Sequence, residues 1–458
     1  MTSNFWNLDD SVSNNTAVIT ESDCKITYEQ LQKDIQDFSK KLPKTRSFVF
    51  LLVDNTYVSL VSYLSCLYAK QPFLLIDLKI EQGLLDTLLM QYNPNILVKF
   101  GNIQVLHSEV FELYPDLAMM ISTSGTTGSP KLVRLSYNNL ASNARSIVDY
   151  LGISDSEVAI TTLPMSYSYG LSIINSHLLA RATIVLNDFG VITRDFWAKI
   201  QNYSVTSFAG VPYVFQMLKR LKYTRFDTSS IRYITQAGGK LDSETIEYFL
   251  AECSALKQRF VVMYGQTEAS PRISYVPPQE LASKVGSIGI AIPEGELYLI
   301  DSTGKRVYSP HVEGEIVYRG ANVMLGYAET TKDLALADEQ KGLLKTGDLG
   351  YFDEDGYFFV TGRAKRFIKL FGLRIGLDSI DYWLSVNSIN AVSTGSDDKL
   401  FICFEGENHD FDEVKRNLAK KFKLNINVIQ SINIKNIPRK NGGKVDFKIL
   451  NNMILELN

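Results

Sequence analysis

The sequence predicts an α/β fold with a large N-terminal domain of doubly wound, mostly parallel sheets plus a small distorted β-barrel, followed by a small α+β C-terminal domain. Three observations indicate this. Apolar runs alternate with helical patterns over the first hundred residues, glycine-broken short strands take over from about residue 283, and a lysine-rich segment of short elements begins after residue 363. At 458 residues the chain is also too long for one ordinary core.

The first hundred residues alternate between helical and strand patterns. Apolar residues at helical spacing over 26–42 predict a helix, and the apolar run at 47–54 predicts a buried strand. The same alternation continues with a helix at 58–70, a strand at 72–78, a helix at 84–92 and a strand at 95–100. Such alternation is typical of a mostly parallel sheet that is covered by helices on its faces.

The later segments predict two further units. Short strands interrupted by glycine, in 287–301, 314–320 and 356–363, indicate a small antiparallel or barrel-like region. The elements expected after it are a strand at 400–407, a helix at 411–422 and a strand at 426–434. We therefore expect a large N-terminal domain at 1–363 and a small C-terminal domain at 364–458.

Composition limits the class of protein. Apolar residues make up 45% of the chain and charged residues 21%, while the net charge is −3, so the chain lacks the basic excess of a nucleic-acid binder. Four cysteines without metal or CxxC spacing suit a reducing compartment. Residues 1–14 lack the apolar core of a signal peptide, and charges interrupt the apolar stretch 48–78. We predict a cytoplasmic protein without nucleic-acid or membrane partners.

The segment ISTSGTTGSPK, residues 121–131, is the strongest local signal. It lies between an expected strand at 118–122 and a helix that Ser136 is expected to cap. Its glycines permit unusual backbone angles, its hydroxyls and amides can point at one anion, and Lys131 adds positive charge. The P-loop pattern does not fit, because the lysine follows Pro130 and Leu132 replaces the required hydroxyl. Taken alone, the segment could also be a surface turn.

This segment resembles the phosphate loop of the adenylate-forming superfamily, which includes acyl-CoA synthetases, peptide-synthetase adenylation domains and luciferases. Seven further segments resemble motifs of that family and occur in its order. They are LPMSYSYGL (163–171), AGG (237–239), MYGQTEAS (263–270), GEIVYRGANVMLGY (314–327), LKTGDLGYFDEDGYFFVTGR (344–363), FIKLFGLRI (367–375) and PRKNGGKVD (438–446). Eight matches in order are far more specific than any one of them.

The resemblance implies an AMP-forming acid–thiol ligase. A carboxylate would attack the α-phosphate of ATP in the presence of Mg²⁺ and give acyl-AMP and pyrophosphate. A thiol, of coenzyme A or of the phosphopantetheine on a separate acyl carrier protein, would then displace AMP. The family's C-terminal domain reorients about a hinge between these steps, and Lys365 occupies the hinge position. A carboxylate is already ionised at neutral pH, so the site must supply positive charge and alignment rather than a general base.

The resemblance also assigns roles to residues. Lys444 would be the catalytic lysine, Glu268 would hold Mg²⁺, and Thr267 would contact the α-phosphate. Asp348 would bind the ribose hydroxyls, assisted by Arg363, and Tyr264 would stack on adenine. The full set of expected nucleotide-binding residues is Ser122, Thr123, Ser124, Gly125, Thr126, Thr127, Gly128, Lys131, Gly238, Gly239, Tyr264, Gly265, Gln266, Asp348 and Arg363.

Local sequence alone gives plainer interpretations of the same residues. Glu268 could be a solvated surface group, Asp348 a turn former and Tyr264 a core aromatic. Lys444 could be one exposed lysine of a basic tail. Only the match to the family's motifs favours the functional interpretation of each.

The acid-binding segment departs from the family pattern. A histidine often stands where this chain has Tyr167, and the expected substrate-binding residues are Tyr167, Tyr169, Ala237 and Lys240. Lys240 would favour an acid with a second anionic group, or would point to solvent. Segment 163–171 has no aspartate to hold a substrate ammonium, which favours an acid without an α-amine. An amino-acid-activating ligase that loads a carrier protein, and a catalytically silent nucleotide-binding homologue, remain as alternatives.

Overall fold

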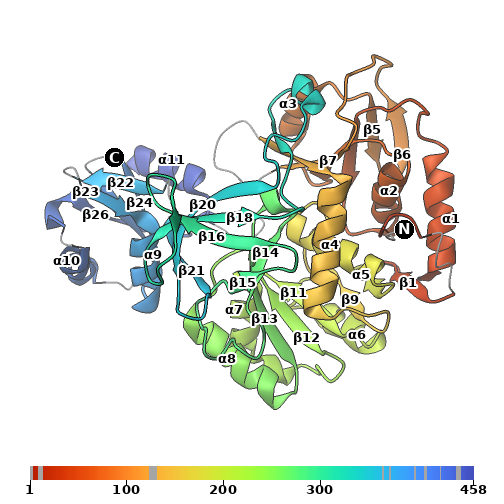
Figure 1. Cartoon of the computed structure of the whole chain (residues 1–458). Helices are drawn as coiled ribbons and strands as arrows, with labels where there is room; N and C mark the ends of the chain where they lie inside the picture. The colour runs from red at the N-terminus through yellow and green to blue at the C-terminus, as the bar shows by residue number, and fades with distance from the viewer. Residues whose placement is uncertain are drawn as a thin grey trace.

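The computed structural model describes residues 4–8, 14–122, 131–363, 366–370, 373–396, 399–406, 410–422, 424–439 and 445–457. Two mixed sheets form the body of the molecule, and the C-terminal elements lie at the far side from the N-terminus (Figure 1). The predicted phosphate-binding residues 123–128, the hinge residue Lys365 and the catalytic residue Lys444 lie outside the described residues.

One sheet has seven strands, in the order β19-β8-β7-β4-β3-β5-β6. Strands β7, β4, β3 and β5 are parallel, whereas β19, β8 and β6 pair antiparallel at the two ends. The strands are β3 (Val49–Val53), β4 (Phe73–Asp77), β5 (Ile96–Lys99), β6 (Asn102–Val105), β7 (Leu117–Ser122), β8 (Leu132–Ser136) and β19 (Gly326–Ala328). Helices α1 (Tyr28–Ser39), α2 (Tyr57–Tyr68) and α3 (Gln82–Tyr92) alternate with the first strands, as predicted.

The other large sheet has nine strands, in the order β15-β14-β13-β12-β11-β9-β10-β1-β2. All neighbours from β13 to β1 are parallel. The strands are β1 (Thr16–Ile19), β2 (Lys25–Thr27), β9 (Val158–Ile160), β10 (Thr183–Val185), β11 (Ser207–Gly210), β12 (Tyr233–Gln236), β13 (Arg259–Gly265), β14 (Arg272–Tyr275) and β15 (Ile290–Ala291). Its helices are α6 (Arg194–Asn202), α7 (Pro212–Leu221) and α8 (Ser243–Ala255), and it has two short 3-10 helices, η2 (Tyr223–Arg225) and η3 (Thr267–Ala269).

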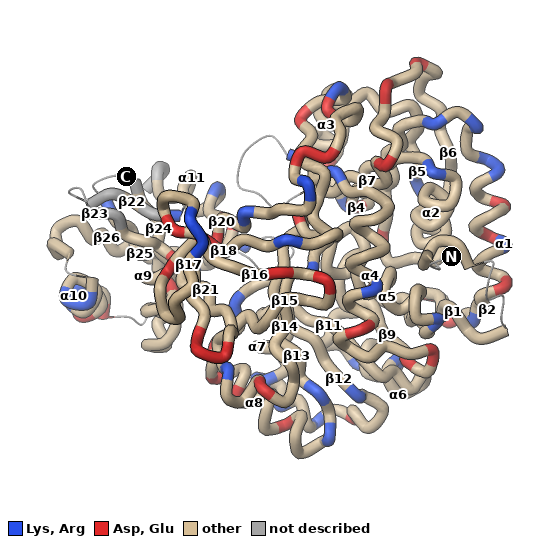
Figure 2. Tube along the Cα trace, in the orientation of Figure 1, with Lys and Arg blue, Asp and Glu red and all other residues tan. Residues whose placement is uncertain are grey.

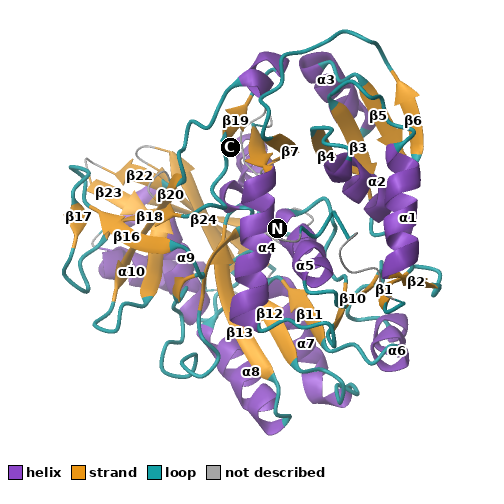
Figure 3. Cartoon of the chain, turned by 45° about the vertical axis from the view of Figure 1, so that its right-hand side comes forward, coloured by secondary structure: helices purple, strands orange, loops and turns teal. Residues whose placement is uncertain are grey.

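Helices α4 (Tyr137–Leu151) and α5 (Ser168–Leu179) pack between the two sheets (Figure 3). One apolar core includes residues of both helices together with strands of both sheets. The Ser136 side chain accepts from the backbone N–H of Asn139 at 3.0 Å, and the Asn139 side chain accepts from the backbone N–H of Ser136 at 2.8 Å. This reciprocal capping confirms the predicted start of α4 directly after the short strand β8.

The predicted barrel-like region is a five-stranded antiparallel sheet, in the order β17-β16-β18-β20-β21. Its strands are β16 (Glu296–Ile300), β17 (Arg306–Val307), β18 (Gly314–Arg319), β20 (Leu343–Phe352) and β21 (Phe358–Arg363), and η4 (Thr331–Ala335) lies before β20. This sheet carries two of the predicted nucleotide-binding residues, Asp348 and Arg363.

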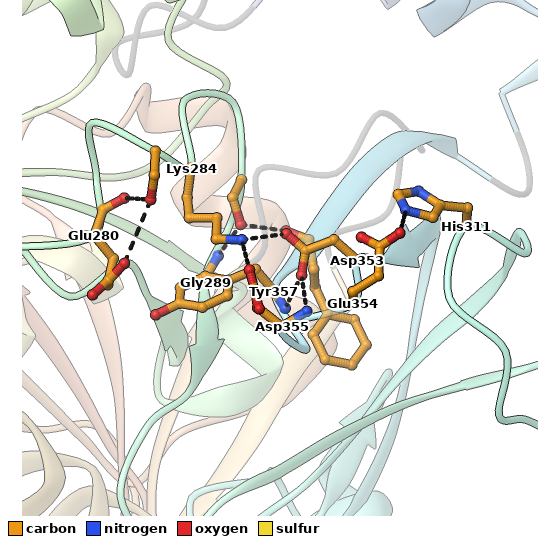
Figure 4. Close-up of polar contacts among 11 residues, drawn as sticks. Glu280, Lys284, Gly289, His311, Asp353, Glu354, Asp355 and Tyr357 are labelled. Atoms are coloured by element: carbon orange, nitrogen blue, oxygen red, sulfur yellow. Dashed lines mark hydrogen bonds and ion pairs between the residues drawn. The ribbon is translucent and has the colours of Figure 1, made fainter.

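The turn between β20 and β21 is tied to the chain before β15. The Lys284 ammonium lies 2.8 Å from an oxygen of Asp353, also pairs with Asp355, and lies 4.9 Å from the ring centroid of Tyr357 (Figure 4). At the other side of the same turn His311 contacts Glu354 at 3.0 Å. These contacts fix the hairpin that carries Asp348 and Arg363 against the nine-stranded sheet's edge.

The C-terminal elements form their own sheets and cores. They are β22 (Phe367–Leu370), β23 (Leu373–Gly376), α9 (Leu377–Val386), β24 (Ala391–Ser396), β25 (Lys399–Glu405), α10 (Phe411–Phe422), η5 (Ile426–Val428), β26 (Ile429–Ile434) and α11 (Phe447–Leu457). Two apolar clusters consist only of residues from 368 onward. Arg366 anchors this unit through Asp378 and Asp381, the latter at 2.7 Å.

Charges of both signs are interspersed along the described chain (Figure 2). Within the described ranges, no helix combines the length and the apolar character that crossing a bilayer would need.

Candidate active site

The carboxylate of Asp348 is the centre of the site. It is buried in β20, and the strand register places it directly opposite Arg363 of β21. One oxygen lies 3.2 Å from Nε of Arg363. The other accepts hydrogen bonds from Nε2 of Gln266, at 3.0 Å, and from the hydroxyl of Tyr264. We call these four residues the Asp348 cluster.

The end of β13 and the turn that follows it contribute Tyr264 and Gln266 to this cluster. A side chain on Gly265 would place Cβ 1.9 Å from the carbonyl oxygen of Pro271, so the close approach of the two chains requires glycine. Gln266 also donates to the carbonyl of Thr346 at 2.9 Å, which fixes its amide. Burial and then the Asp348 charge raise the pKa of Tyr264 well above its usual value, so its hydroxyl stays protonated and donates.

A second group of contacts surrounds Glu268. Its Oε1 accepts from the hydroxyl of Tyr327 at 2.9 Å, and Lys131 lies 6.0 Å from the Tyr327 ring centroid while pairing with Glu329 at 2.6 Å. Antiparallel pairing of β19 with β8 places Tyr327 opposite Val133. This pairing therefore brings the end of the predicted phosphate loop to the predicted magnesium residue. Ser122, at the other end of that loop, is the exposed last residue of β7.

The predicted acid-binding residues lie beside the turn that carries Thr267 and Glu268. Ser168 and Thr267 are joined by a hydroxyl–hydroxyl hydrogen bond of 3.2 Å. Gly238 has φ of +86°, and a Cβ there would lie 2.9 Å from the Tyr167 hydroxyl, so glycine is needed on both counts. Tyr167, Tyr169 and Ala237 belong to one apolar cluster. The structure thus brings the LPMSYSYGL, AGG and YGQTE segments together.

Gly239 and Lys240 complete the AGG turn. The carbonyl of Gly239 accepts from the Gln236 side chain at 2.8 Å. The Lys240 ammonium lies 4.1 Å from the ring centroid of Tyr382 in α9, so its observed contact is with the C-terminal unit. Burial lowers the pKa of Lys240, and the nearby charge of Asp378 opposes that shift. Its role in the acid pocket stays a prediction.

Sequence reasoning missed two residues of this region. Tyr327 ends a recognised motif but was given no role, because its contact with Glu268 depends on the pairing of strands far apart in the chain. Arg272 lies two residues after the YGQTEAS segment and begins β14, where it is 2% exposed. A charged residue at the start of a short strand was the available signal for Arg272.

The described residues fit a magnesium–nucleotide complex. Within the described ranges no group of three or more His, Cys, Asp or Glu side chains could form a complete protein-only metal site. Mg²⁺ is typically held by one or two carboxylates together with substrate phosphates and water. Glu268, beside the ends of the predicted phosphate loop, is a carboxylate of that kind.

Comparison with known proteins identifies the class. The family model described as AMP-binding enzyme matches residues 112–328. A 4-coumarate–CoA ligase of Narcissus pseudonarcissus is 30% identical over 354 residues, which are 73% of this chain and 64% of the relative. A probable 4-coumarate–CoA ligase of Dictyostelium discoideum is 33% identical over 57% of this chain and 47% of the relative. These matches agree with the predicted membership of the adenylate-forming superfamily.

Solved structures agree on the fold. The o-succinylbenzoate CoA synthetase of Bacillus subtilis, in complex with its acyl-adenylate intermediate, superimposes with a TM-score of 0.80 at 23% identity, covering 98% of both chains. ATP-bound MatB from Rhodopseudomonas palustris superimposes with a TM-score of 0.81 at 22% identity over the whole of both chains. The matches to the first curated relatives span about half to two thirds of those proteins' own length.

Proposed function

We propose that the protein activates a carboxylic acid with ATP and then transfers the acyl group to a thiol. The observation that carries this proposal is the Asp348 cluster, in which Tyr264 and Gln266 of one motif converge with the buried carboxylate and the arginine of another. A two-oxygen acceptor is suited to the paired hydroxyls of a ribose. The hydroxyl of Tyr264 is hydrogen-bonded to Asp348, so its ring would stack on adenine. The backbone of Gly238 and Gly239 would line the opposite side of the base.

The same proposal assigns the chemistry. An oxygen of the acid attacks the α-phosphorus, the bond between the α-phosphorus and the bridging oxygen breaks, and pyrophosphate leaves with the electron pair. A thiolate then attacks the acyl carbon and AMP departs. Mg²⁺, held in part by Glu268, would neutralise phosphate charge. Residues Ser122 to Lys131 would bind the phosphates, Thr267 would contact the α-phosphate, and Lys444 would stabilise the charge that develops as the two anions meet.

Several findings support this proposal over its alternatives. Relatives of this chain include enzymes described as CoA ligases for 4-coumarate and oxalate. Coenzyme A is the acceptor we favour, with carrier-protein phosphopantetheine second. The absence of a carboxylate in segment 163–171 argues against an amino-acid substrate. A silent homologue would have no physical reason to keep all four of the charged residues Glu268, Asp348, Arg363 and Lys444.

Location and domain division are parts of the same proposal. All four cysteines are free, and burial raises the pKa of Cys66, Cys253 and Cys403 to about 12, which suits unreactive thiols in a reducing compartment such as the cytoplasm. We propose residues 1–363 as the AMP-binding domain and 364–458 as the mobile domain, with Lys365 at the hinge.

The test is a screen of carboxylic acids for pyrophosphate release from ATP and Mg²⁺, with and without coenzyme A. Lys444→Ala should lower acid-dependent release by about a hundredfold or more, because a charge used in the transition state is lost. Lys448→Ala, at a neighbouring exposed lysine, is the matched control and should leave release unchanged. Full activity of Lys444→Ala would refute the assigned role, and no release with any acid would refute the proposed function.

A further inference from the structure

Arg272 is a buried cation for which the described protein supplies no counter-charge. Its side chain is 2% exposed, and its buried Nε has no hydrogen-bond partner among the described residues. Nη2 donates to the hydroxyl of Ser172 at 3.3 Å. The ion pairs that the described arginines make involve Arg134, Arg232, Arg306, Arg363 and Arg366, and none involves Arg272.

The surroundings of Arg272 are neutral and largely apolar, with a few polar side chains. It lines a cavity of about 20 Å³ together with Ser172, Ser176, His177, Tyr233 and Thr235, and the Tyr150 hydroxyl lies beside it as a further neutral partner. Burial lowers the pKa of His177 to about 4, so its ring is neutral at physiological pH. Burial also raises the pKa of Tyr169 and Tyr233, which keeps both phenols protonated. The cavity therefore offers hydrogen bonds and one positive charge, with no anion among these lining groups.

Arg272 is connected to the predicted acid-binding residues through Tyr169. Its guanidinium is 4.7 Å from the ring centroid of Tyr169, and the Tyr169 ring packs edge-on against Tyr167 at 6.4 Å. The Tyr167 hydroxyl faces Gly238, and the intervening Ser168 contacts Thr267. A line of contacts thus runs from the predicted α-phosphate residue, through the two tyrosines, to Arg272.

A buried charge is costly unless an opposite charge or a full set of hydrogen bonds compensates it. Since the described residues give Arg272 neither, a ligand is the natural source of the missing charge. The planar guanidinium, with Nε free, matches a carboxylate that accepts two parallel hydrogen bonds.

We propose that Arg272 binds a second carboxylate at the far end of the acid, so that the substrate is a short dicarboxylic acid. The inference rests on the proposed function, because it assigns the acid of that reaction. A small cavity limits the far end to one compact group beside Ser172 and Thr235. Arg272, and not Lys240, is then the positive charge that binds the second carboxylate, because Lys240 contacts Tyr382 of α9.

The rival explanation is structural. A cavity of this size is roughly large enough for one ordered water, which would satisfy Nε and make Arg272 a packing residue only. A packing residue would not discriminate between acids, so selectivity separates the two explanations.

The first measurement uses the full-length wild-type chain. Acid-dependent ATP–pyrophosphate exchange is compared for matched pairs in which a terminal methyl replaces the second carboxylate: succinate with butyrate, glutarate with valerate, and adipate with hexanoate. We expect kcat/KM to favour at least one diacid over its partner by roughly 30-fold or more, the factor typical of a buried charge pair. Equal or better use of all three monoacids would overturn the proposal.

The second measurement uses variants of Arg272. Arg272→Met keeps the length of the side chain without its charge and should lose most diacid activity while retaining monoacid activity, so the ratio inverts. Arg272→Lys should keep part of the diacid preference. Arg306→Met, which removes an arginine from β17 outside the acid pocket, is the matched control and should leave the ratio unchanged. An equal loss with every acid in Arg272→Met, with folding intact by thermal melting, would overturn the proposal in favour of a packing role.

A binding measurement separates failure of this proposal from failure of the proposed function. Calorimetric titration of the wild type and Arg272→Met with the same acids, without ATP, needs no catalysis. Arg272-dependent diacid binding without exchange for any acid would refute the proposed function and support the diacid site. Exchange with monoacids that is indifferent to Arg272 would refute the diacid site and support the proposed function.

Discussion

The carboxylate of Asp348 contacts three other predicted nucleotide-binding side chains. These neighbours come from β13, the turn after it and β21, yet the motif match already assigned Tyr264, Gln266, Asp348 and Arg363 to one nucleotide site. Motifs predict such sites well because each position in them needs one residue type for its contact with the ligand. Ser136 was predicted for the same reason, since a cap is a local property of the chain.

Replacing Asp348 tests the proposed ribose contact. Asp348→Asn keeps the shape of the side chain but removes its charge, and a hydrogen bond to a charged group contributes about 1.5–3 kcal/mol. We expect the Kd for ATP, measured by calorimetry, to rise about 10- to 100-fold. Asp301→Asn, in the exposed turn between β16 and β17, is the control. An unchanged Kd in Asp348→Asn, with normal thermal stability, would contradict the ribose role.

Arg272 and Tyr327 show where residue-level prediction stops. Neither belongs to a pattern that reveals its partner in the sequence. Arg272 meets Tyr169 and Ser172 only because β14 lies beside α5, and Tyr327 meets Glu268 only because β19 pairs with β8. Contacts of this kind depend on tertiary placement, which apolar periodicity does not specify.

Periodicity and glycine positions predicted many elements over the first hundred residues and after residue 287, among them α1, β3, α2, β4, α3 and β5. They did not predict β1, β2, α9, β24 or α11. The pairing of the strands was less predictable. Strand β8 was not predicted, because its five residues lie between the loop and the cap of α4. The antiparallel ends of both large sheets were missed as well, because an edge strand is distinguished by its neighbours rather than by its own composition.

The hairpin of β20 and β21 should lose stability in acid through Lys284. Burial raises the pKa of Asp353, but hydrogen bonds from Lys284 and from backbone amides outweigh this and leave the pKa below its usual value. A carboxyl with a lowered folded-state pKa stabilises the fold above its unfolded pKa, near 3.9, and this contribution is lost as pH falls through the folded value.

Lys284→Met should therefore melt at a lower temperature than the wild type near neutral pH, and the difference in Tm should shrink as the pH is lowered from about 6 to about 3. Lys25→Met, at an exposed lysine of β2, is the control and should show no such convergence. Calorimetric melting over this pH range checks the prediction. A constant difference in Tm would show that Lys284 acts through packing on Tyr357 rather than through Asp353.

At the scale of the whole molecule, the apolar clusters of the C-terminal elements contain only residues from 368 onward, and the cluster of the five-stranded sheet ends before that position. The domain division at 363/364 stays a prediction. The relative placement of the two units could not be predicted from sequence. It depends on contacts such as that between Lys240 and Tyr382, whose partners lie in different units and match no pattern.

If the C-terminal unit reorients between two half-reactions, holding Lys240 to Tyr382 should stop one of them. The double variant Lys240→Cys/Tyr382→Cys, in a Cys24→Ser background that removes the exposed native thiol, can be joined by a short bis-maleimide linker. We expect one half-reaction, pyrophosphate exchange or thioester formation, to fall at least about tenfold while the other persists. The same double variant without linker is the control. Undiminished rates of both after complete linking would contradict reorientation at this contact.

The pairing of Asp348 with Arg363 has one further consequence. Arg363 is the last residue of β21, and the predicted pivot at Lys365 is only two peptide units away. If the C-terminal unit rotates about the predicted pivot, this short connection would pass the rotation to the guanidinium that contacts Asp348. Under the proposed function, binding of the nucleoside and the orientation of the C-terminal unit would then be coupled, so that release of AMP would accompany the rotation that precedes the next turnover.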